Sequence, residues 1–228
     1  MLSEAENDTA AAKCRVELCR ALAEAFREAG DLLWVGGNLL GPDRVSKSSP
    51  FDFGSDAAVG LATVIQIAGE LISGAVVLLE QENIYAAAAL IRQLVEIEYL
   101  TWAFAEDHQQ AEAWLRSSRD ERLKFWQPRD LRTRSAGRFR SADYAHHCER
   151  GGHPTPEAMA LLPDHSRRDS AMLWWFDLAI HSASTWDYVN AAATEFGWSD
   201  QVDPIASRRG LAASIKSWRQ REPLMHLL

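Results

Sequence analysis

Cysteine is scarce in this sequence, and no disulfide framework is expected. The 228 residues contain three cysteines, Cys14, Cys19 and Cys148. Cys14 and Cys19 are five residues apart, which places them on different faces of a helix. Reduced cysteines are typical of the cytosol, so a cytoplasmic protein is predicted. The first residues, MLSEAENDTAAAK, are acidic and polar and do not have the pattern of a signal peptide.

The motifs of several common enzyme classes are also missing. The chain has no G-x-S-x-G motif, no Walker motif, no dinucleotide-binding glycine pattern, and neither C-x2-C nor H-E-x-x-H. One pattern resembles metal ligands, the H-H-C-x4-H series with His146, His147 and His153. Adjacent residues on a helix point about 100° apart, so His146 and His147 are not expected to share an ion. No cofactor and no metal site are predicted, and a zinc-dependent enzyme is kept as a third hypothesis behind the two given below.

The sequence lacks strand periodicity, internal repeats and low-complexity tracts. Apolar residues make up 47% of the chain and recur at helical spacing. We predict an all-α, single-domain helical bundle over residues 1–228, with five or more long helices and short helices near 129–162. Nine tryptophans are expected in the core or at an interface, and a homodimer is predicted.

One apolar run is long enough to suggest a membrane span. Residues 57–79 contain Gln66, Glu70 and three glycines. A carboxylate in the middle of a span is costly in lipid, so this run is interpreted as a buried helix and no membrane partner is expected.

Caps and breaks predict the order of the helices. Gly30 is a natural C-terminal cap for a first helix, and the Gly-, Pro- and Ser-rich residues 31–54 are expected to form a loop. Asn83 separates two long helices that should pack as an antiparallel hairpin. A turn is expected at Gly151–Gly152. The predicted helices are 3–29, 55–82, 84–107, 108–126, a short one before Gly137, 141–149, one from Pro156, 164–196 and 203–219.

The helix expected over 84–104 is apolar on almost every side but contains charged residues. Arg92 and Glu96 are four residues apart and share one face. An isolated buried charge is very costly, so the pair forms either the polar floor of a site or a buried structural tie. If the pair is buried, replacing either residue by alanine should cost about 3–5 kcal/mol of stability. We predict that it supports the histidine-rich turn at 143–154.

Charge is distributed unevenly along the chain. The overall net charge is −8, yet residues 116–140 contain nine basic and three acidic residues, a net charge of +6. Such asymmetry indicates an anionic partner for this segment. The alternative is that these arginines pair with acidic helices of the same fold or of a second subunit.

Arg140 and His146 form the pattern R-SADYA-H. Such a pair can perform metal-free phosphodiester chemistry, because the histidine transfers a proton near neutral pH and the arginine stabilises the developing phosphate charge. The pattern resembles the signature of HEPN domains, helical prokaryotic domains of toxins and defence systems. The resemblance implies a metal-independent ribonuclease in which Arg140 and His146 are catalytic. It also implies completion by dimerisation and contact of the basic segment 116–140 with RNA. A protein partner from the same operon is a separate expectation.

A second resemblance covers more of the chain. An R-x-x-x-E helix, a basic stretch, a tyrosine and a His-Pro dipeptide are similar to a group of uncharacterised bacterial helical proteins, some of them placed near abortive-infection genes. The matching residues are Arg92, Glu96, Tyr144, His153 and Pro154. The resemblance implies no particular reaction, but it makes His153 a rival to His146 as the important histidine.

A small polar cavity would form if the Arg92/Glu96 face points toward His147 or His153. The alternative is a buried network that fixes helix register. Asp177 and His181, four residues apart, could orient each other or reach the same cavity. The second hypothesis for function is therefore a non-enzymatic interaction or ligand-sensing module with a structural Arg/Glu/His network.

Overall fold

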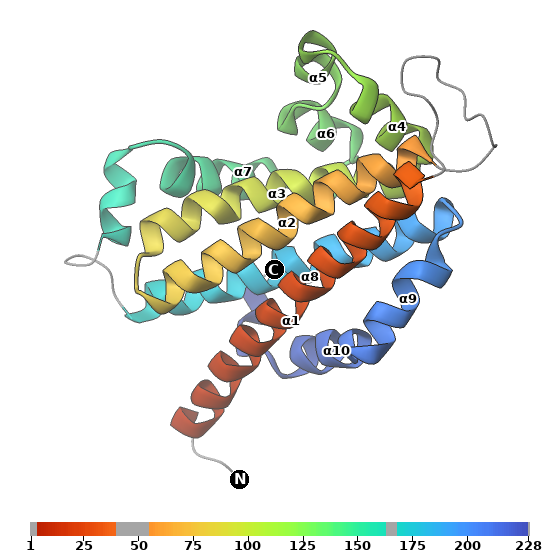
Figure 1. Cartoon of the computed structure of the whole chain (residues 1–228). Coiled ribbons are helices and arrows are strands. Elements are labelled where there is room, and N and C mark those ends of the chain that lie inside the picture. The colour runs from red at the N-terminus through yellow and green to blue at the C-terminus, as the bar shows by residue number, and fades with distance from the viewer. Residues whose placement is uncertain (1–3, 40–54, 163–167, 228) are drawn as a thin grey trace.

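Four long helices make up the body of the molecule in the computed structural model, which describes residues 4–39, 55–162 and 168–227. Every regular element in these ranges is a helix, so the all-α bundle is confirmed. α1, α2, α3 and α8 pack together, the shorter α4–α7 lie along one side, and α9 and α10 cover another (Figure 1). The helices are α1 (Glu4–Leu39), α2 (Asp56–Glu80), α3 (Ile84–Glu106), α4 (His108–Arg116), α5 (Arg119–Phe125), α6 (Pro128–Arg134), α7 (Ser141–His147), the π-helix η1 (Cys148–Gly152), the 3₁₀ helices η2 (Pro156–Leu161) and η3 (Pro223–Leu227), α8 (Arg168–Glu195), α9 (Ser199–Arg208) and α10 (Leu211–Arg221).

The α2–α3 hairpin has the predicted caps. The Ser55 hydroxyl accepts a hydrogen bond from the Ala58 N–H at the start of α2. The Asn83 side chain accepts one from the Ala86 N–H at the start of α3. Each cap satisfies a backbone donor that has no partner within its helix. The predicted hairpin is confirmed.

The first helix is longer than predicted. α1 continues past Gly30 to Leu39, so residues 31–39 of the predicted loop are helical, and 40–54 lie outside the described residues. Gly30 does not cap the helix but lets it approach α2, since a Cβ there would lie 2.5 Å from Cγ of Gln66. Close helix packing therefore explains this glycine.

Other predicted helices are divided by local caps. The predicted 108–126 helix is split at residues 117–118, where Ser118 and Glu121 form a capping box that starts α5. The predicted 203–219 helix is two helices, separated at Gly210, whose φ of 60° lies in the left-handed region. The turn predicted at Gly151–Gly152 is the end of η1.

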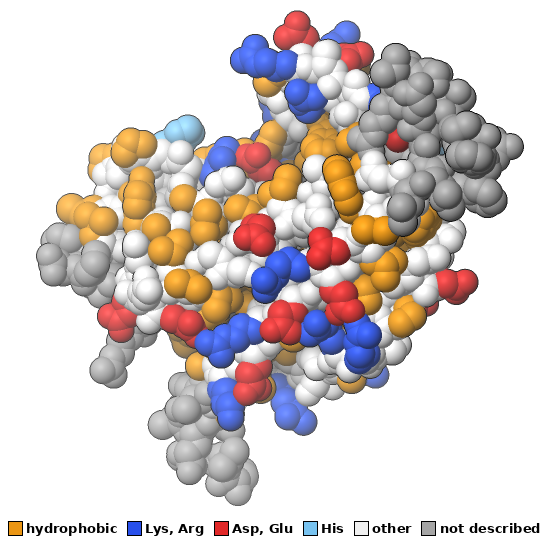
Figure 2. All heavy atoms as spheres, in the orientation of Figure 1, with side chains coloured by type: hydrophobic (Ala, Val, Ile, Leu, Met, Phe, Trp, Pro, Cys, Tyr) orange, Lys and Arg blue, Asp and Glu red, His pale blue; other side chains and the backbone are white. Residues whose placement is uncertain are grey.

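α2 is long and apolar enough to span a membrane by length and composition. In its most apolar window, however, 56% of the residues are buried inside the protein, which fits a core helix of a soluble protein. α1, α3, α4 and α8 all contact it. Acidic and basic side chains lie close together on the visible face over α1 and again over α5, while apolar side chains gather over α2 and α3 (Figure 2).

Candidate functional site

α7 and its N-cap carry four of the residues singled out from the sequence, Arg140, Tyr144, His146 and His147. The helix lies along α3 (Figure 1), with Arg140 at its N-cap and His147 at its end. η1 continues it and is seated directly on α3, because a Cβ on Gly151 would lie 2.4 Å from the carbonyl oxygen of Ala88. This contact fixes the side chains of α7 relative to α3 and α8.

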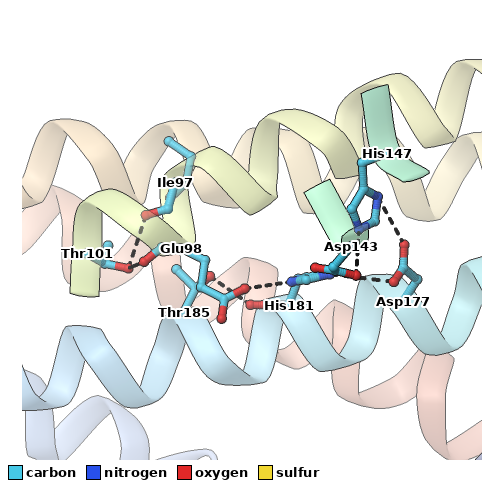
Figure 3. A network of polar contacts seen from close by, with 8 residues as sticks. All are labelled: Ile97, Glu98, Thr101, Asp143, His147, Asp177, His181 and Thr185. Atoms are coloured by element: carbon cyan, nitrogen blue, oxygen red, sulfur yellow. Dashed lines mark hydrogen bonds and ion pairs between the residues drawn. The ribbon is translucent and has the colours of Figure 1, made fainter. Parts of the chain in front are cut away.

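One group of titratable side chains lies between α3, α7 and α8 (Figure 3). We call it the histidine–carboxylate cluster. Nδ1 of His181 is 2.6 Å from Oε2 of Glu98, and Nε2 of the same ring is 3.5 Å from Oδ1 of Asp177. Nδ1 of His147 is 3.5 Å from Oδ2 of Asp177, and its Nε2 is 3.8 Å from Oδ1 of Asp143. Its members are Glu98, Asp143, His147, Asp177 and His181.

The centre of the cluster is buried, but its polar atoms are not all paired. The His147 side chain is 0% exposed, and neither ring nitrogen has a hydrogen-bond partner among the described residues. Oδ2 of Asp177 is also buried without one. Buried polar groups are usually hydrogen-bonded, so these atoms need an explanation. Asp143, with 37% of its side chain exposed, connects the cluster to solvent.

The two histidines of the cluster have opposite shifts in pKa. Burial lowers the pKa of His147, and the nearby Asp177 carboxylate only partly offsets this. Burial also acts to lower the pKa of His181, but the Glu98 carboxylate and the hydrogen bonds to Asp177 and Glu98 outweigh it, so this pKa is raised well above its ordinary value. For Asp177, burial acts to raise the pKa, but the two histidines outweigh it and the pKa is lowered.

Arg92 and Glu96 belong to a different network, which is centred on Tyr144. Nη2 of Arg92 is 2.8 Å from Oε1 of Glu96 and donates a 3.1 Å hydrogen bond to the Tyr144 hydroxyl. That hydroxyl donates a 2.8 Å hydrogen bond to Glu96. The side chains of Arg92 and Glu96 are 24% and 32% exposed, so the pair is not the fully buried tie considered from the sequence.

The two histidines considered as partners of Arg92 and Glu96 lie elsewhere. His147 is in the histidine–carboxylate cluster, and His153 is exposed beyond η1. Cys148 is the neighbour of Arg92 on this side. Arg92 and Glu96 therefore contact the 143–154 segment through Tyr144 and not through a histidine.

The structure places Arg140 and His146 at opposite ends of α7. Arg140 lines a hollow of about 550 Å³ together with Arg129 and Arg132. His146 is exposed, and its ring stacks on Trp174 of α8 with ring centroids 6.0 Å apart. Within the described part of the chain, no hydrogen bond or ring contact joins Arg140 to His146.

The basic segment 116–140 is only partly neutralised within the fold. Arg116 pairs with Asp56 and Glu112, as the structural alternative expected. Arg132 has no acidic partner among the described residues; its guanidinium lies 4.3 Å over the Tyr144 ring. The hollow is lined by Arg129, Arg132, Thr133, Gly137, Phe139, Arg140, Ser141 and Ala142.

Comparison with known protein families, with curated proteins and with solved structures finds no match to this chain. The arrangement of side chains therefore has to indicate the chemistry. The arginine-lined hollow can hold an anion, and the histidine–carboxylate cluster has nitrogen and oxygen atoms that could hold a metal ion.

The sequence patterns assign no role to Glu98 and do not predict that Asp143 and His147 belong to one site. A signal is present, because Asp143–His147 and Asp177–His181 are two copies of the spacing D-x-x-x-H. This spacing puts an acid and a histidine on one helix face. Nothing in the spacing shows that the two faces meet.

Proposed function

We propose that this chain binds RNA, and that the arginine-lined hollow beside α7 holds phosphates of the strand. The observation that carries the proposal is the convergence of Arg129, Arg132 and Arg140 on one hollow. Guanidinium groups bind phosphate oxygens through paired N–H donors. The hollow between these three guanidinium groups has a volume of about 550 Å³, which is enough for a sugar–phosphate segment.

Arg132 supports this proposal most directly. Its Nε and Nη1 are buried and have no hydrogen-bond partner among the described residues. The Tyr144 ring beneath the guanidinium restrains its position through a cation–π contact. No carboxylate among the described residues neutralises this guanidinium, and the side chain lines the hollow, so its positive charge is available to an anion there. The side chain is thus already oriented for an anion.

Exposed apolar side chains accompany the basic ones. Leu123 and Phe125 of α5 are 47% and 45% exposed. Nη2 of Arg134 on α6 donates a hydrogen bond to the Phe125 carbonyl, which connects the two short helices. Aromatic rings next to basic side chains are typical of single-strand binding, because bases stack on the rings while the cations follow the backbone.

Binding can be measured by fluorescence anisotropy with a short labelled single-stranded RNA. We expect Arg132→Gln and Arg140→Gln each to weaken binding and to reduce the dependence of log K on log salt by about 0.7 for each phosphate that the variant no longer neutralises. Arg119→Gln is the matched control, because Arg119 is exposed in the same segment and does not line the hollow. Equal weakening by all three variants would contradict a site in the hollow.

Cleavage of the bound RNA is the further step that the HEPN resemblance suggests. Arg140 would hold the phosphate and His146 would transfer the proton. The two residues are six positions apart on α7, a rise of about 9 Å, so completion of the site by a second copy of the chain is part of this proposal. A homodimer that brings His146 of one chain to Arg140 of the other would satisfy it.

Incubation with RNA in EDTA separates the two functional hypotheses. Cleavage that is lost in both Arg140→Ala and His146→Ala would support the metal-independent ribonuclease. RNA binding without cleavage at high protein concentration would instead support a non-enzymatic interaction module, in which the Tyr144-centred network is structural.

A further inference from the structure

The histidine–carboxylate cluster has the donor set of a metal site. We propose that Asp143, His147 and His181 bind one divalent transition-metal ion of the zinc class. One ligand atom from each of these residues lies within 4.8 Å of the other two. Two of these residues come from α7 and one from α8, so the ion would connect the short helix to the bundle.

The spacing of the donors is close to that of an occupied site. Zinc–nitrogen and zinc–oxygen distances of about 2.0–2.2 Å place tetrahedral ligand atoms about 3.4 Å apart. Nε2 of His147 and Oδ1 of Asp143 are already 3.8 Å apart. The other donor pairs lie within 4.8 Å, so the three donors would move closer together to bind one ion.

Carboxylates on the far side of each ring fix the orientation of the two histidines. Glu98 lies at Nδ1 of His181, at 2.6 Å, and Asp177 lies at Nδ1 of His147, at 3.5 Å. Asp177 also lies 3.5 Å from Nε2 of His181, so the ion would replace the proton on this nitrogen, and that proton would be released to solvent. Histidines that bind metals usually donate their second N–H to such a group, which sets the tautomer and directs the other nitrogen to the ion. Figure 3 shows both rings between their carboxylates, with Asp143 beside them.

His147 is the observation that distinguishes this cluster from an ordinary buried ion pair. Its side chain is 0% exposed and both ring nitrogens lack a hydrogen-bond partner among the described residues. A metal ion would occupy the lone pair of Nε2 and leave the Nδ1–H for Asp177. The buried polar atoms would then be satisfied together.

The donor set also indicates the kind of ion. Two imidazoles and a carboxylate suit Zn²⁺ and neighbouring transition metals, whereas Ca²⁺ and Mg²⁺ prefer oxygen ligands alone. Three protein ligands leave one position for water, as in catalytic zinc sites. Asp143, with 37% of its side chain exposed, lies on the side from which ions and water can enter.

The test is a titration of metal-stripped full-length protein with Zn²⁺ or Co²⁺, followed by calorimetry. We expect one ion per chain. His147→Gln and Asp143→Asn should each weaken binding at least tenfold. His146→Gln is the matched control, because His146 immediately precedes His147 in α7 but lies on the exposed side of the helix. Zn²⁺ at a hundredfold excess over Kd should raise Tm by about 5–10 °C in the unmodified protein.

Two results would overturn the site. One is the absence of binding at 100-fold molar excess of Zn²⁺, and the other is equal affinity in the unmodified protein, His147→Gln and Asp143→Asn, which would show surface binding only. Asp143 is partly exposed, so Asp143→Asn reports on the site even if the buried His147→Gln variant does not fold. RNA binding should persist in EDTA, because the arginines of the hollow are not metal ligands.

Discussion

At the scale of single residues, Tyr144 connects positions that are distant in sequence. Its hydroxyl contacts Arg92 and Glu96, which precede it by 52 and 48 residues, and its ring lies beneath the guanidinium of Arg132. The charges of Arg92 and Glu96 are partly solvated. Removing one of them should therefore cost less than the 3–5 kcal/mol expected for a fully buried pair, and the hydroxyl that joins them becomes the more informative target.

We predict that Tyr144→Phe lowers the free energy of unfolding by about 1–2 kcal/mol, because the variant cannot form the two hydrogen bonds to charged groups. Urea denaturation measures the change. Tyr85→Phe is the control. Tyr85, on α3, is half-buried like Tyr144 but has no hydrogen bond among the described residues. Equal effects of the two substitutions would show that the Tyr144 hydroxyl contributes nothing to stability.

The residue scale also shows what periodicity can predict of the candidate site. The helical repeat places Asp177 and His181 on one helix face, where the two side chains can orient each other. Glu98 lies 83 residues before His181, and their 2.6 Å contact depends on how α3 packs against α8. No local sequence pattern indicates how α3 packs against α8, so Glu98 could not be predicted from the sequence as the partner of His181.

At the scale of helices, local caps are reliable signals and glycines are ambiguous ones. Ser55 and Asn83 start helices as predicted, because an N-cap is a short-range hydrogen bond. Gly30 and Gly151 are expected in a cap and a turn, but they lie where two helices come close together. A glycine suits a helix cap or turn and a close contact between helices equally well, and only the tertiary structure shows which of the two applies.

Gly151→Ala tests how tightly η1 is seated on α3. The new Cβ would lie 2.4 Å from a carbonyl oxygen of the α3 backbone, which cannot move aside. We expect a loss of about 1–3 kcal/mol in the free energy of unfolding, as for other overpacked positions. Gly152→Ala is the adjacent control, because its Cβ meets the flexible Arg92 side chain.

Urea denaturation of both variants measures the difference. Gly152→Ala should cost less than Gly151→Ala, since Arg92 can rotate away. If Gly152→Ala costs as much, backbone conformation at the end of η1, and not contact with α3, would explain the need for glycine.

At the scale of the whole molecule, a buried ion pair joins the first helix to the end of the chain. Nε and Nη2 of Arg15 donate hydrogen bonds of 2.7 and 2.6 Å to the carboxylate of Glu222, 207 residues later. Both side chains are almost completely buried. Nε1 of Trp218 donates a further hydrogen bond to Glu222. The pair therefore couples the docking of α10 to the position of α1.

This pair should make stability depend on pH. Burial acts to raise the pKa of Glu222, but the hydrogen bonds from Arg15 outweigh it, so the pKa is lowered from its ordinary value of 4.5. The unfolded chain then binds more protons than the folded one in this range, and stability rises with pH. The contribution is complete above about pH 4.5 and is lost as the pH falls through the folded-state pKa.

Glu222→Gln isolates that contribution, because it keeps the shape of the side chain and removes its charge. At pH 7 it should lower the free energy of unfolding by about 3–5 kcal/mol, since Arg15 is left buried without its counter-ion. The difference from the unmodified protein should shrink below about pH 4.5, where Glu222 of the unfolded chain begins to take up a proton while the folded chain keeps it ionised. Urea denaturation from pH 3 to 7 measures both quantities, with Glu17→Gln on the exposed face of α1 as the control. A difference that stays constant over this range would mean that packing, and not the charge of Glu222, holds the two ends of the chain together.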